Sequence, residues 1–271
     1  MNLPFYKYQG TGNDFVMIDN RSKLLNADLI NVSNICDRRF GVGADGLILI
    51  EQHDELDFNM IYFNSDGSRS FCGNGSRCAV SFAKKMGIIQ QETYFLSTDG
   101  EHYARFEQDW IHLQMHNVSQ VEIGEYFYIL NTGSPHFIQF IDDVATFDVV
   151  GEAKKIRYND RFSQTGINVN FVEAEGEVLK VRTYERGVEN ETLSCGTGVT
   201  AVALAHHLRV SGNKGEFLQK ISTPGGNLSV RFQYDGIAEF NHIFLAGPAE
   251  EVFQGNIHST VFYPQSAEIN R

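Results

Sequence analysis

Two cysteines of this chain occur in the same local setting. The motif Cys-Gly-x-Gly begins at Cys72 and again at Cys195, and small and apolar residues follow each copy, as expected for the first turns of a helix. A thiol at a helix N-terminus lies close to unpaired N–H groups, which stabilise a thiolate and bind anions. Two such thiols predict a reaction that needs two proton-transfer groups.

Two kinds of chemistry suit a pair of activated thiols. In the first, one thiolate removes a proton from one face of a carbon and the other thiol donates a proton to the opposite face, which inverts a stereocentre. The backbone amides of the Gly-x-Gly turns would then hold the substrate carboxylate and stabilise the charge that develops on it. In the second, the thiols form a disulfide, and the chain is a redox-regulated binding protein.

Other polar residues lie at landmarks close to these cysteines. Arg186, which precedes the second cysteine motif, is placed to clamp a carboxylate, and His136 could tune a thiol. Four asparagines at turns or strand ends could bind ammonium and carboxylate groups without adding charge: Asn13, Asn64, Asn74 and Asn168. The other two cysteines, Cys36 and Cys78, have no Gly-x-Gly setting and are interpreted as packing residues.

The elements that must position these residues occur as an ordered repeat. Thr11-Gly12 recurs as Thr132-Gly133, the first cysteine motif recurs as the second, and Ser97-Thr98 recurs as Ser222-Thr223. The order and the nearly constant offset indicate an internal duplication. We expect the two cysteine loops to lie symmetrically about a shared cleft, because ligand sites favour domain interfaces.

The local patterns predict an α+β fold. Short strands rich in β-branched and aromatic residues alternate with turns, for example at 47–51 and 58–64, and a helix is predicted over 28–40 and after each cysteine motif. Each half is expected to contain mostly antiparallel strands and one main helix. The predicted domains are residues 1–118 and 119–259, with 260–271 as a candidate addition to the first half.

Composition and charge exclude several classes of protein. The chain has 271 residues, of which 42% are hydrophobic, and its net charge of −12 without a basic cluster argues against nucleic-acid and membrane partners. No signal-peptide core or membrane-length apolar run is present, so we expect a cytoplasmic protein with free thiols. Neither a zinc pattern nor a nucleotide-binding fingerprint occurs, and no lysine is identified for pyridoxal phosphate, which favours a reaction without metal or cofactor.

At these residues the sequence resembles the diaminopimelate epimerase family. The segments that carry the resemblance are 10–15, 63–67, 72–78, 184–187, 195–198, 224–226 and 246–248. The resemblance implies two pseudo-symmetric domains, each with antiparallel strands wrapped around a central helix. It also implies interconversion of LL- and meso-diaminopimelate without pyridoxal phosphate or metal. Members of the family act in lysine and peptidoglycan precursor biosynthesis in the cytoplasm, usually as homodimers.

The resemblance also implies roles for particular residues. Cys72 and Cys195 would be the base and the acid, and His136 and Glu185 would tune the thiols. The substrate-binding residues would be Asn13, Asn64, Gly73, Asn74, Asn168, Glu185, Arg186, Gly196 and Thr197.

The chain departs from the family pattern at two positions on the substrate side. The family usually has Gln at the position of Gly46 and Asn at the position of Ser134. The alternative enzyme is a related two-thiol racemase or epimerase for another amino acid, such as proline or hydroxyproline. A tail from Ser259 to Arg271 is also expected to extend beyond the family segments.

Overall fold

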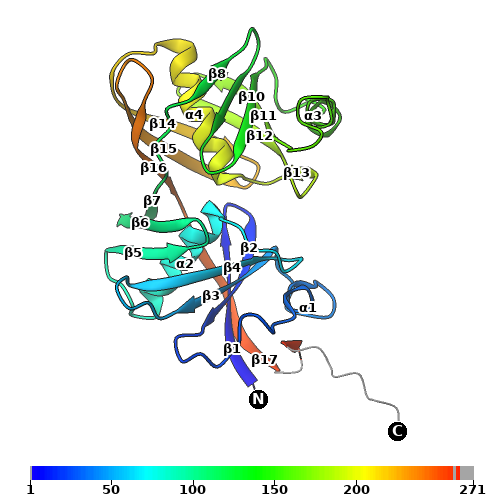
Figure 1. The fold of residues 1–271 in the computed structure, drawn as a ribbon, viewed down its shortest axis with the longest axis vertical. Helices are drawn as coiled ribbons and strands as arrows, with labels where there is room; N and C mark the ends of the chain where they lie inside the picture. The colour runs from blue at the N-terminus through cyan, green and yellow to red at the C-terminus, as the bar shows by residue number, and fades with distance from the viewer. Residues whose placement is uncertain (1, 259–260, 263–271) are drawn as a thin grey trace. The chain divides into compact units, whose positions relative to one another are not determined.

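The computed structural model describes residues 2–258 and 261–262 and consists mainly of β-strands, with a buried helix after each Cys-Gly-x-Gly motif (Figure 1). Contacts divide the chain into unit 1, which comprises Met1–Phe106 and Ala249–Arg271, and unit 2, which comprises Glu107–Pro248. Each unit has its own buried core.

The predicted halves and these two units are defined in different ways. The halves 1–118 and 119–259 come from repeated landmarks in the sequence, whereas the units come from contacts, so the halves stay a prediction about the duplication. The stretch 260–271, a candidate addition to the first half, lies outside the described residues except for Val261 and Phe262.

Unit 1 is a mixed sheet in which each parallel pair of strands is joined through a helix. Its strands are β1 (Asn2–Gly10), β2 (Asn13–Asp19), β3 (Gly46–Glu51), β4 (Phe58–Asn64), β5 (Glu92–Ser97), β6 (Gly100–Glu107) and β17 (Glu250–His258). The strands β2 and β3 are parallel, as are β4 and β5, and the other pairs are antiparallel. A parallel pair needs a crossover connection. Here α1 (Val32–Cys36) and α2 (Gly73–Lys85) lie in the two crossovers.

Unit 2 repeats this pairing order and adds further strands. Its strands are β7 (Trp110–Gln114), β8 (Val121–Ile123), β9 (Tyr128–Asn131), β10 (Pro135–Phe140), β11 (Asn168–Glu175), β12 (Val178–Glu185), β13 (Asn190–Thr192), β14 (Gly215–Thr223), β15 (Gly226–Tyr234) and β16 (Phe240–Gly247). From β9 to β15, parallel and antiparallel pairs follow one another in the same order as from β1 to β6. The pairs β10–β11 and β12–β14 are parallel, and the rest are antiparallel. The crossovers contain α3 (Val149–Arg157) and α4 (Gly196–Val210).

Three strands that follow a repeat in the chain pair with strands of the other unit. The strands β7 and β8 follow β6, yet they pair with β16 and β9 in unit 2. The strand β17 follows β16, yet it pairs with β1 in unit 1. The predicted α+β fold and duplicated topology are therefore confirmed. The parallel pairs were not expected, because the sequence pattern shows strand content but not which strands become neighbours.

The predicted helix over 28–40 is wrong in extent, since only α1 is helical there. The side chain of Asn31 caps its first turn by accepting the Asn34 N–H, and the Asn31 N–H donates to the carbonyl of Phe262 at 2.6 Å. The helix ends at Asp37, whose carboxylate accepts backbone N–H groups from the two residues at 39–40 and so stabilises a turn instead of a further helical turn.

The two long helices hold the cysteine motifs against the sheets. The helix α2 contacts β1, β2, β3 and β4, and α4 contacts strands that include β10, β11 and β15. Almost every side chain in the first three turns of α2 is buried, and α4 is buried along most of its length. Packing of this kind fixes the position of each helix N-terminus, and therefore of the thiol that precedes it.

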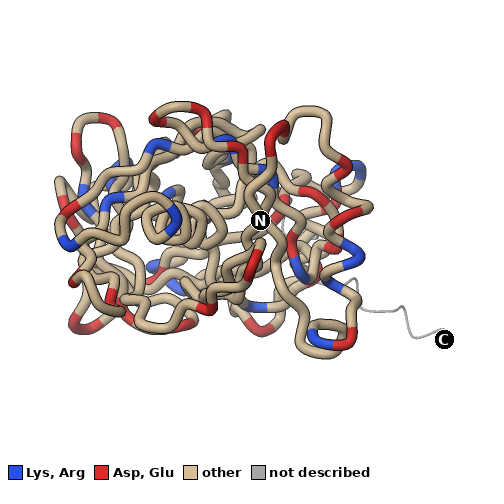
Figure 2. Tube along the Cα trace, turned by 90° about the horizontal axis from the view of Figure 1, so that it is seen from above, with Lys and Arg blue, Asp and Glu red and all other residues tan. Residues whose placement is uncertain are grey.

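Charged residues of both signs are interspersed over the chain trace (Figure 2). Among the described residues, no helix is both long and apolar enough to cross a membrane.

We predict that Phe82→Ala destabilises the protein by about 3–5 kcal/mol, because it removes a fully buried ring and leaves a cavity. The ring of Phe82 lies on α2, with centroids 5.0 Å from Tyr6 and 5.9 Å from Tyr8. Urea unfolding followed by circular dichroism measures the loss. Phe40→Ala, at a side chain that is 80% exposed, is the matched control and should leave the midpoint almost unchanged. Equal midpoints for the two variants would contradict the packing argument.

Candidate functional site

Cys72 is the N-cap residue of α2 and uses its thiol as the capping group. Its backbone is extended, and its Sγ accepts the N–H of Gly75 at 3.3 Å. Serine or threonine oxygens usually fill this role. The sulfur is therefore held within the positive end of the helix, where a thiolate is stabilised.

Asn13 presents an amide oxygen to the same sulfur. Its Oδ1 lies 3.6 Å from Cys72 Sγ, and its Nδ2 donates to the Asp45 carboxylate at 2.7 Å. A carboxylate can only accept, so this bond fixes which end of the Asn13 amide faces the thiol. Asp45 is paired in turn with Arg38 at 3.0 Å. Asn13 thus stands between the catalytic candidate and a charged network.

That charged network is anchored at Asp14. Burial raises the pKa of Asp14, but hydrogen bonds from Arg38 and Lys7 outweigh burial and lower it to about 2. Asp14 therefore remains ionised at neutral pH, and the loop that carries Asn13 is tied down by two cations.

The two residues that follow Cys72 are hydrogen-bonded to a buried arginine, Arg77. Asn74 is buried, and its Oδ1 accepts from Arg77 Nη2 at 2.9 Å and from the Thr11 hydroxyl at 3.5 Å. The Gly73 carbonyl accepts a hydrogen bond from Arg77 Nη1 at 3.4 Å. With its oxygen engaged by donors, the Asn74 amide turns its NH2 group away from Arg77.

Asn64 lies at the end of β4 and is fixed by a tyrosine that fills the space above Gly46. In the β3–β4 register Gly46 is opposite Asn64, and Tyr62 lies on the same face because side chains alternate along a strand. A Cβ at Gly46 would come within 2.5 Å of the Tyr62 ring. The Tyr62 hydroxyl donates to Asn64 Oδ1 at 2.8 Å, and Asn64 Nδ2 donates to Ser68 Oγ at 2.9 Å. At the position where the resemblance led us to expect a glutamine, the polar group is therefore a tyrosine hydroxyl.

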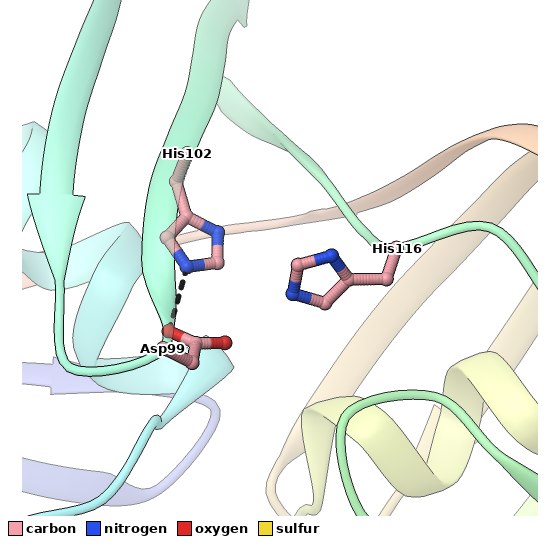
Figure 3. Close-up of side chains that lie close together, drawn as sticks. All are labelled: Asp99, His102 and His116. Carbon is pink, nitrogen blue, oxygen red and sulfur yellow. Dashed lines mark hydrogen bonds and ion pairs between the residues drawn. The ribbon is translucent and has the colours of Figure 1, made fainter.

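The chain immediately before Cys72 is secured by aromatic stacking in unit 1. His102 is buried and hydrogen-bonded to Asp99 at 2.8 Å (Figure 3). Its ring stacks on Phe71, the residue before Cys72, with centroids 4.6 Å apart. Two sides of the motif are thus fixed, one by α2 and the other by this stack. His116, also drawn in Figure 3, belongs to unit 2.

Cys195 is the N-cap residue of α4, but its thiol makes no capping hydrogen bond to the helix. It is buried, and its Sγ lies 3.5 Å from the hydroxyl of Thr197. That hydroxyl lies 2.9 Å from Nε2 of His136, and the Thr197 carbonyl accepts from the Thr132 hydroxyl at 2.7 Å. The second thiol is therefore linked to His136 through Thr197 rather than by direct contact.

Asn170 sets the tautomer of His136. Its Nδ2 donates to the Phe137 carbonyl at 3.0 Å and lies 3.1 Å from His136 Nδ1, while its Oδ1 accepts from the Thr183 hydroxyl at 3.0 Å. The Phe137 carbonyl can only accept, so Nδ2 is the donor and His136 Nδ1 must accept. The imidazole hydrogen then resides on Nε2 and donates to Thr197, which leaves the Thr197 hydroxyl hydrogen available for the Cys195 sulfur.

His136 is neutral at physiological pH. It is completely buried, and desolvation, together with the positive charge of Arg186, lowers its pKa to about 3. It therefore orients the relay to Cys195 and does not supply a charge to it.

Arg186, Asn168 and Ser134 form a second polar group in unit 2. Asn168 accepts the Arg186 backbone N–H at 2.8 Å and donates to Ser134 Oγ at 2.9 Å. The Arg186 guanidinium donates to the Thr165 carbonyl at 3.0 Å and to Ser134 Oγ at 3.4 Å. A cation, an amide and a hydroxyl gathered in this way can recognise an amino-carboxylate group.

Glu185 lies at the end of β12, and its carboxylate accepts a hydrogen bond from the Thr192 hydroxyl. Its predicted role in tuning a thiol stays a prediction.

The structure groups the predicted residues by unit. Unit 1 holds Cys72, Asn13, Asn64, Gly73 and Asn74, and unit 2 holds Cys195, His136, Asn168, Glu185, Arg186, Gly196 and Thr197. The predicted shared cleft stays a prediction. Sequence reasoning missed Arg77, Tyr62, Asp45 and Asn170. Two of them had a usable signal: Arg77 is the one charged residue in the first three turns of α2, ahead of Lys84 and Lys85 in the last turn, and Asn170 shares the strand face of Asn168.

Comparison with known proteins identifies close relatives. The family model described as "Diaminopimelate epimerase" matches residues 5–119 and 128–252. A diaminopimelate epimerase of Flavobacterium psychrophilum is 50% identical over 259 residues, which cover 94% of this chain and all of the relative. One from Aquifex aeolicus is 38% identical and covers 96% of this chain and 99% of the relative.

Solved structures share the fold at low sequence identity. A phenazine biosynthesis protein of the PhzF family from Bacillus anthracis has a TM-score of 0.76 at 13% identity, covering 95% of this chain and 99% of its own. A hydroxyproline epimerase from Agrobacterium vitis has a TM-score of 0.66 at 14% identity, covering 94% and 92%. These likenesses confirm the α+β fold alone.

We predict that His136 makes the protein less stable in acid. Its pKa is lowered in the fold, so below about pH 6.5 the unfolded chain binds a proton at this site that the folded chain does not. The free energy of unfolding should therefore decrease by about 1.4 kcal/mol per pH unit from this site alone until about pH 3. Urea unfolding between pH 7 and pH 4 measures the slope. His136→Gln should show a shallower slope, and parallel slopes for the two proteins would refute the assignment.

Proposed function

Because the chain belongs to the diaminopimelate epimerase family, we propose that it interconverts LL- and meso-diaminopimelate with Cys72 and Cys195 as the two acid–base groups. The chain is an isomerase. The observation that carries the catalytic assignment is that both cysteines are N-cap residues of buried helices, where a thiol can exchange protons near neutral pH. Lysine and peptidoglycan precursor biosynthesis is the proposed pathway.

In the proposed mechanism one cysteine acts as a thiolate and the other as a thiol. The thiolate takes the proton from the α-carbon of the substrate, and the electron pair of the broken C–H bond moves into the adjacent carboxylate. Backbone N–H groups of Gly73, Asn74, Gly196 and Thr197 would stabilise this charge. The second thiol then returns a proton to the opposite face of the same carbon. The substrate loses one proton and gains another, so its composition is unchanged, and the two sulfurs exchange protonation states.

The distal end of the substrate is assigned to the asparagine and arginine groups. Arg186 and Asn168 share Ser134 as a hydrogen-bond partner, and the Arg186 guanidinium would pair with the distal carboxylate. Asn64, fixed by Tyr62, and Asn13, fixed by Asp45, would contribute amide groups. The Ser134 side chain is short. We therefore assign it to orienting Asn168 and Arg186, whose donors it accepts, and not to direct contact with the substrate.

A proline-type substrate is the nearest alternative, because a hydroxyproline epimerase has the same fold. Proline has a single amino-carboxylate centre, and it would leave Arg186 without a substrate carboxylate to bind. The high identity to named diaminopimelate epimerases also favours the acyclic substrate.

We further propose a cytoplasmic homodimer that works without metal or pyridoxal phosphate. None of the four cysteines is in a disulfide in the described part of the chain, and we propose that joining Cys72 to Cys195 by oxidation would inactivate the enzyme.

We predict that Cys72→Ala and Cys195→Ala each reduce epimerisation by about three orders of magnitude or more, since general acid–base groups contribute about 10²–10⁴-fold each. The assay incubates purified protein with LL-diaminopimelate in deuterium oxide and follows α-deuterium by NMR and meso product by chiral chromatography. Cys36→Ala is the matched control, because that thiol is buried and its pKa is raised to about 12 by desolvation. Near-normal rates in either of the first two variants would rule out a two-thiol mechanism, and no deuterium incorporation by the wild type would rule out the activity.

We predict that Arg186→Met raises the KM for diaminopimelate by about tenfold or more, because a charge-assisted pair contributes about 1.5–3 kcal/mol. Arg161→Met is the control: that arginine is also in unit 2, is half-exposed and pairs with Glu122 at 2.6 Å. Steady-state kinetics with both variants measure the effect. An unchanged KM in Arg186→Met would remove Arg186 from the substrate site.

A further inference from the structure

Arg186 is the first residue of a tight turn between β12 and β13, and Glu189 is the last. Glu185 lies opposite Asn190 in the strand register, so residues 186–189 form the turn, called here the Arg186 turn. The Glu189 N–H donates to the Glu185 carbonyl at 2.8 Å. Glu189 has a φ of 56°, in the left-handed region that favours glycine and asparagine. A glutamate keeps this conformation only where its surroundings compensate, which directs attention to its side chain.

The Glu189 carboxylate accepts five hydrogen bonds. Its Oε1 accepts from Arg157 Nε at 3.2 Å, from Arg157 Nη2 at 2.9 Å and from the Gly187 N–H at 3.3 Å. Its Oε2 accepts from the hydroxyls of Tyr158 at 3.0 Å and Tyr184 at 3.1 Å. Burial raises the pKa of Glu189, but these hydrogen bonds outweigh burial and keep the pKa below its usual range. The carboxylate is therefore ionised at neutral pH.

Arg157 joins the Arg186 turn to a second segment of unit 2. While its Nε and Nη2 bind Glu189, its Nη1 donates to the carbonyls of Phe162 at 3.2 Å and Ser163 at 3.4 Å. Exposed ion pairs contribute little to stability, but the Arg157 side chain is only 12% exposed. One guanidinium thus ties the carboxylate of the turn to the backbone of the segment at 162–163.

The same segment continues into the residues that contact the Arg186 side chain. The Arg186 guanidinium donates to the Thr165 carbonyl at 3.0 Å. A Cβ at Gly166 would come within 2.5 Å of Arg186 Cδ and 3.2 Å of Arg157 Cζ, so the stem of Arg186 lies against the Gly166 backbone. The Arg186 N–H donates to Asn168 Oδ1 at 2.8 Å. Both the turn that carries Arg186 and the segment that receives its guanidinium are therefore bonded to Arg157.

From these contacts we propose that Arg157 and Glu189 are positioning residues that fix the direction of the Arg186 guanidinium, and thereby the place where the second carboxylate of the substrate binds. Glu189 fixes the backbone of the Arg186 turn, and Arg157 fixes the segment to which the guanidinium donates. Neither residue is assigned a contact with the substrate. What Arg186 binds rests on the proposed function, whereas how Arg186 is held does not.

A purely structural role for the pair leads to a different expectation. Residues that only stabilise unit 2 would change the free energy of unfolding and leave the KM of the folded enzyme as it is. Residues that affect substrate binding independently of Arg186 would change the KM by the same factor whether or not Arg186 is present. Residues that act through Arg186 would lose their effect once Arg186 is removed.

The test is a double-mutant cycle between Glu189 and Arg186, read by steady-state epimerisation of LL-diaminopimelate. Glu189→Asn suits the left-handed backbone but removes the charge and one methylene. It should raise the KM by about threefold to tenfold and keep kcat within about twofold, because the ground state and the transition state lose the same interaction. Added to Arg186→Met, it should cause no further increase in the KM.

Glu122→Asn is the matched control for the loss of a carboxylate. Glu122 pairs with Arg161 elsewhere in unit 2, and its replacement should leave the KM unchanged. Circular dichroism identifies a variant that does not fold. If Glu189→Asn does not fold, Glu189→Gln takes its place in the cycle under the same criteria, because it keeps the length of the side chain and removes only the charge.

Hydrogen–deuterium exchange of the full chain without substrate gives a second measurement. The backbone N–H groups of Arg186, Gly187 and Glu189 all donate hydrogen bonds in the structure. The peptide that contains the Arg186 turn should exchange faster in Glu189→Asn than in the wild type, by about threefold or more, because the turn opens more readily. Glu122→Asn should leave the exchange of this peptide unchanged.

Three results would overturn the inference. These are an unchanged KM in folded Glu189→Asn while Arg186→Met raises it, the same factor of increase with and without Arg186, or unchanged exchange of the Arg186 turn in folded Glu189→Asn. A wild type that incorporates no deuterium into diaminopimelate, or an unchanged KM in Arg186→Met, would instead refute the proposed function or the assigned role of Arg186 in it. The exchange measurement then decides by itself whether Glu189 holds the turn.

Discussion

The unpaired N–H groups at the start of two buried helices are the feature on which the candidate chemistry depends. A helix that is packed against a sheet cannot leave its first amides unsatisfied without a cost in free energy. In α2 the sulfur of Cys72 accepts one of these N–H groups, whereas the sulfur of Cys195 makes no capping hydrogen bond to α4. The glycines that follow each cysteine add no side chain over these N–H groups, so the same few residues begin a helix and form the proposed thiol and anion sites.

Around the two helix N-termini, the repeats differ in the charge of one buried residue, and in both of them hydrogen bonds orient the neighbouring amide side chains. Two of the amide side chains are oriented by a partner that can only accept: Asp45 for Asn13 and the Phe137 carbonyl for Asn170. Such partners decide the direction of a hydrogen bond and not merely its presence. The difference in charge arises at one pair of equivalent helix positions, Arg77 and Thr200, where the duplication kept the backbone bond and changed the electrostatics.

The proposed substrate side shows how neighbouring residues compensate for a departure at one position. Gly46 has no side chain, but Tyr62 occupies the space beside it and donates to Asn64. Ser134 is short, but it joins Asn168 to Arg186. These contacts connect residues that are separated by up to dozens of positions in the chain, and they explain how a site can tolerate the loss of a polar side chain without losing its polar lining.

The sequence by itself determined the α+β class, the duplication and the helices behind both cysteines, because these depend on short motifs and local hydrophobic pattern. It did not determine the parallel strand pairs, the short extent of α1 or the exchange of β17 into unit 1, since these depend on which distant strands become neighbours. The tertiary structure alone decided that Arg77 is buried in α2, that His136 is neutral and hydrogen-bonded to Thr197, and that Tyr62 fills the space beside Gly46. The physical reason is that burial and hydrogen-bond direction are properties of an environment built from several strands, whereas a motif specifies only its own residues.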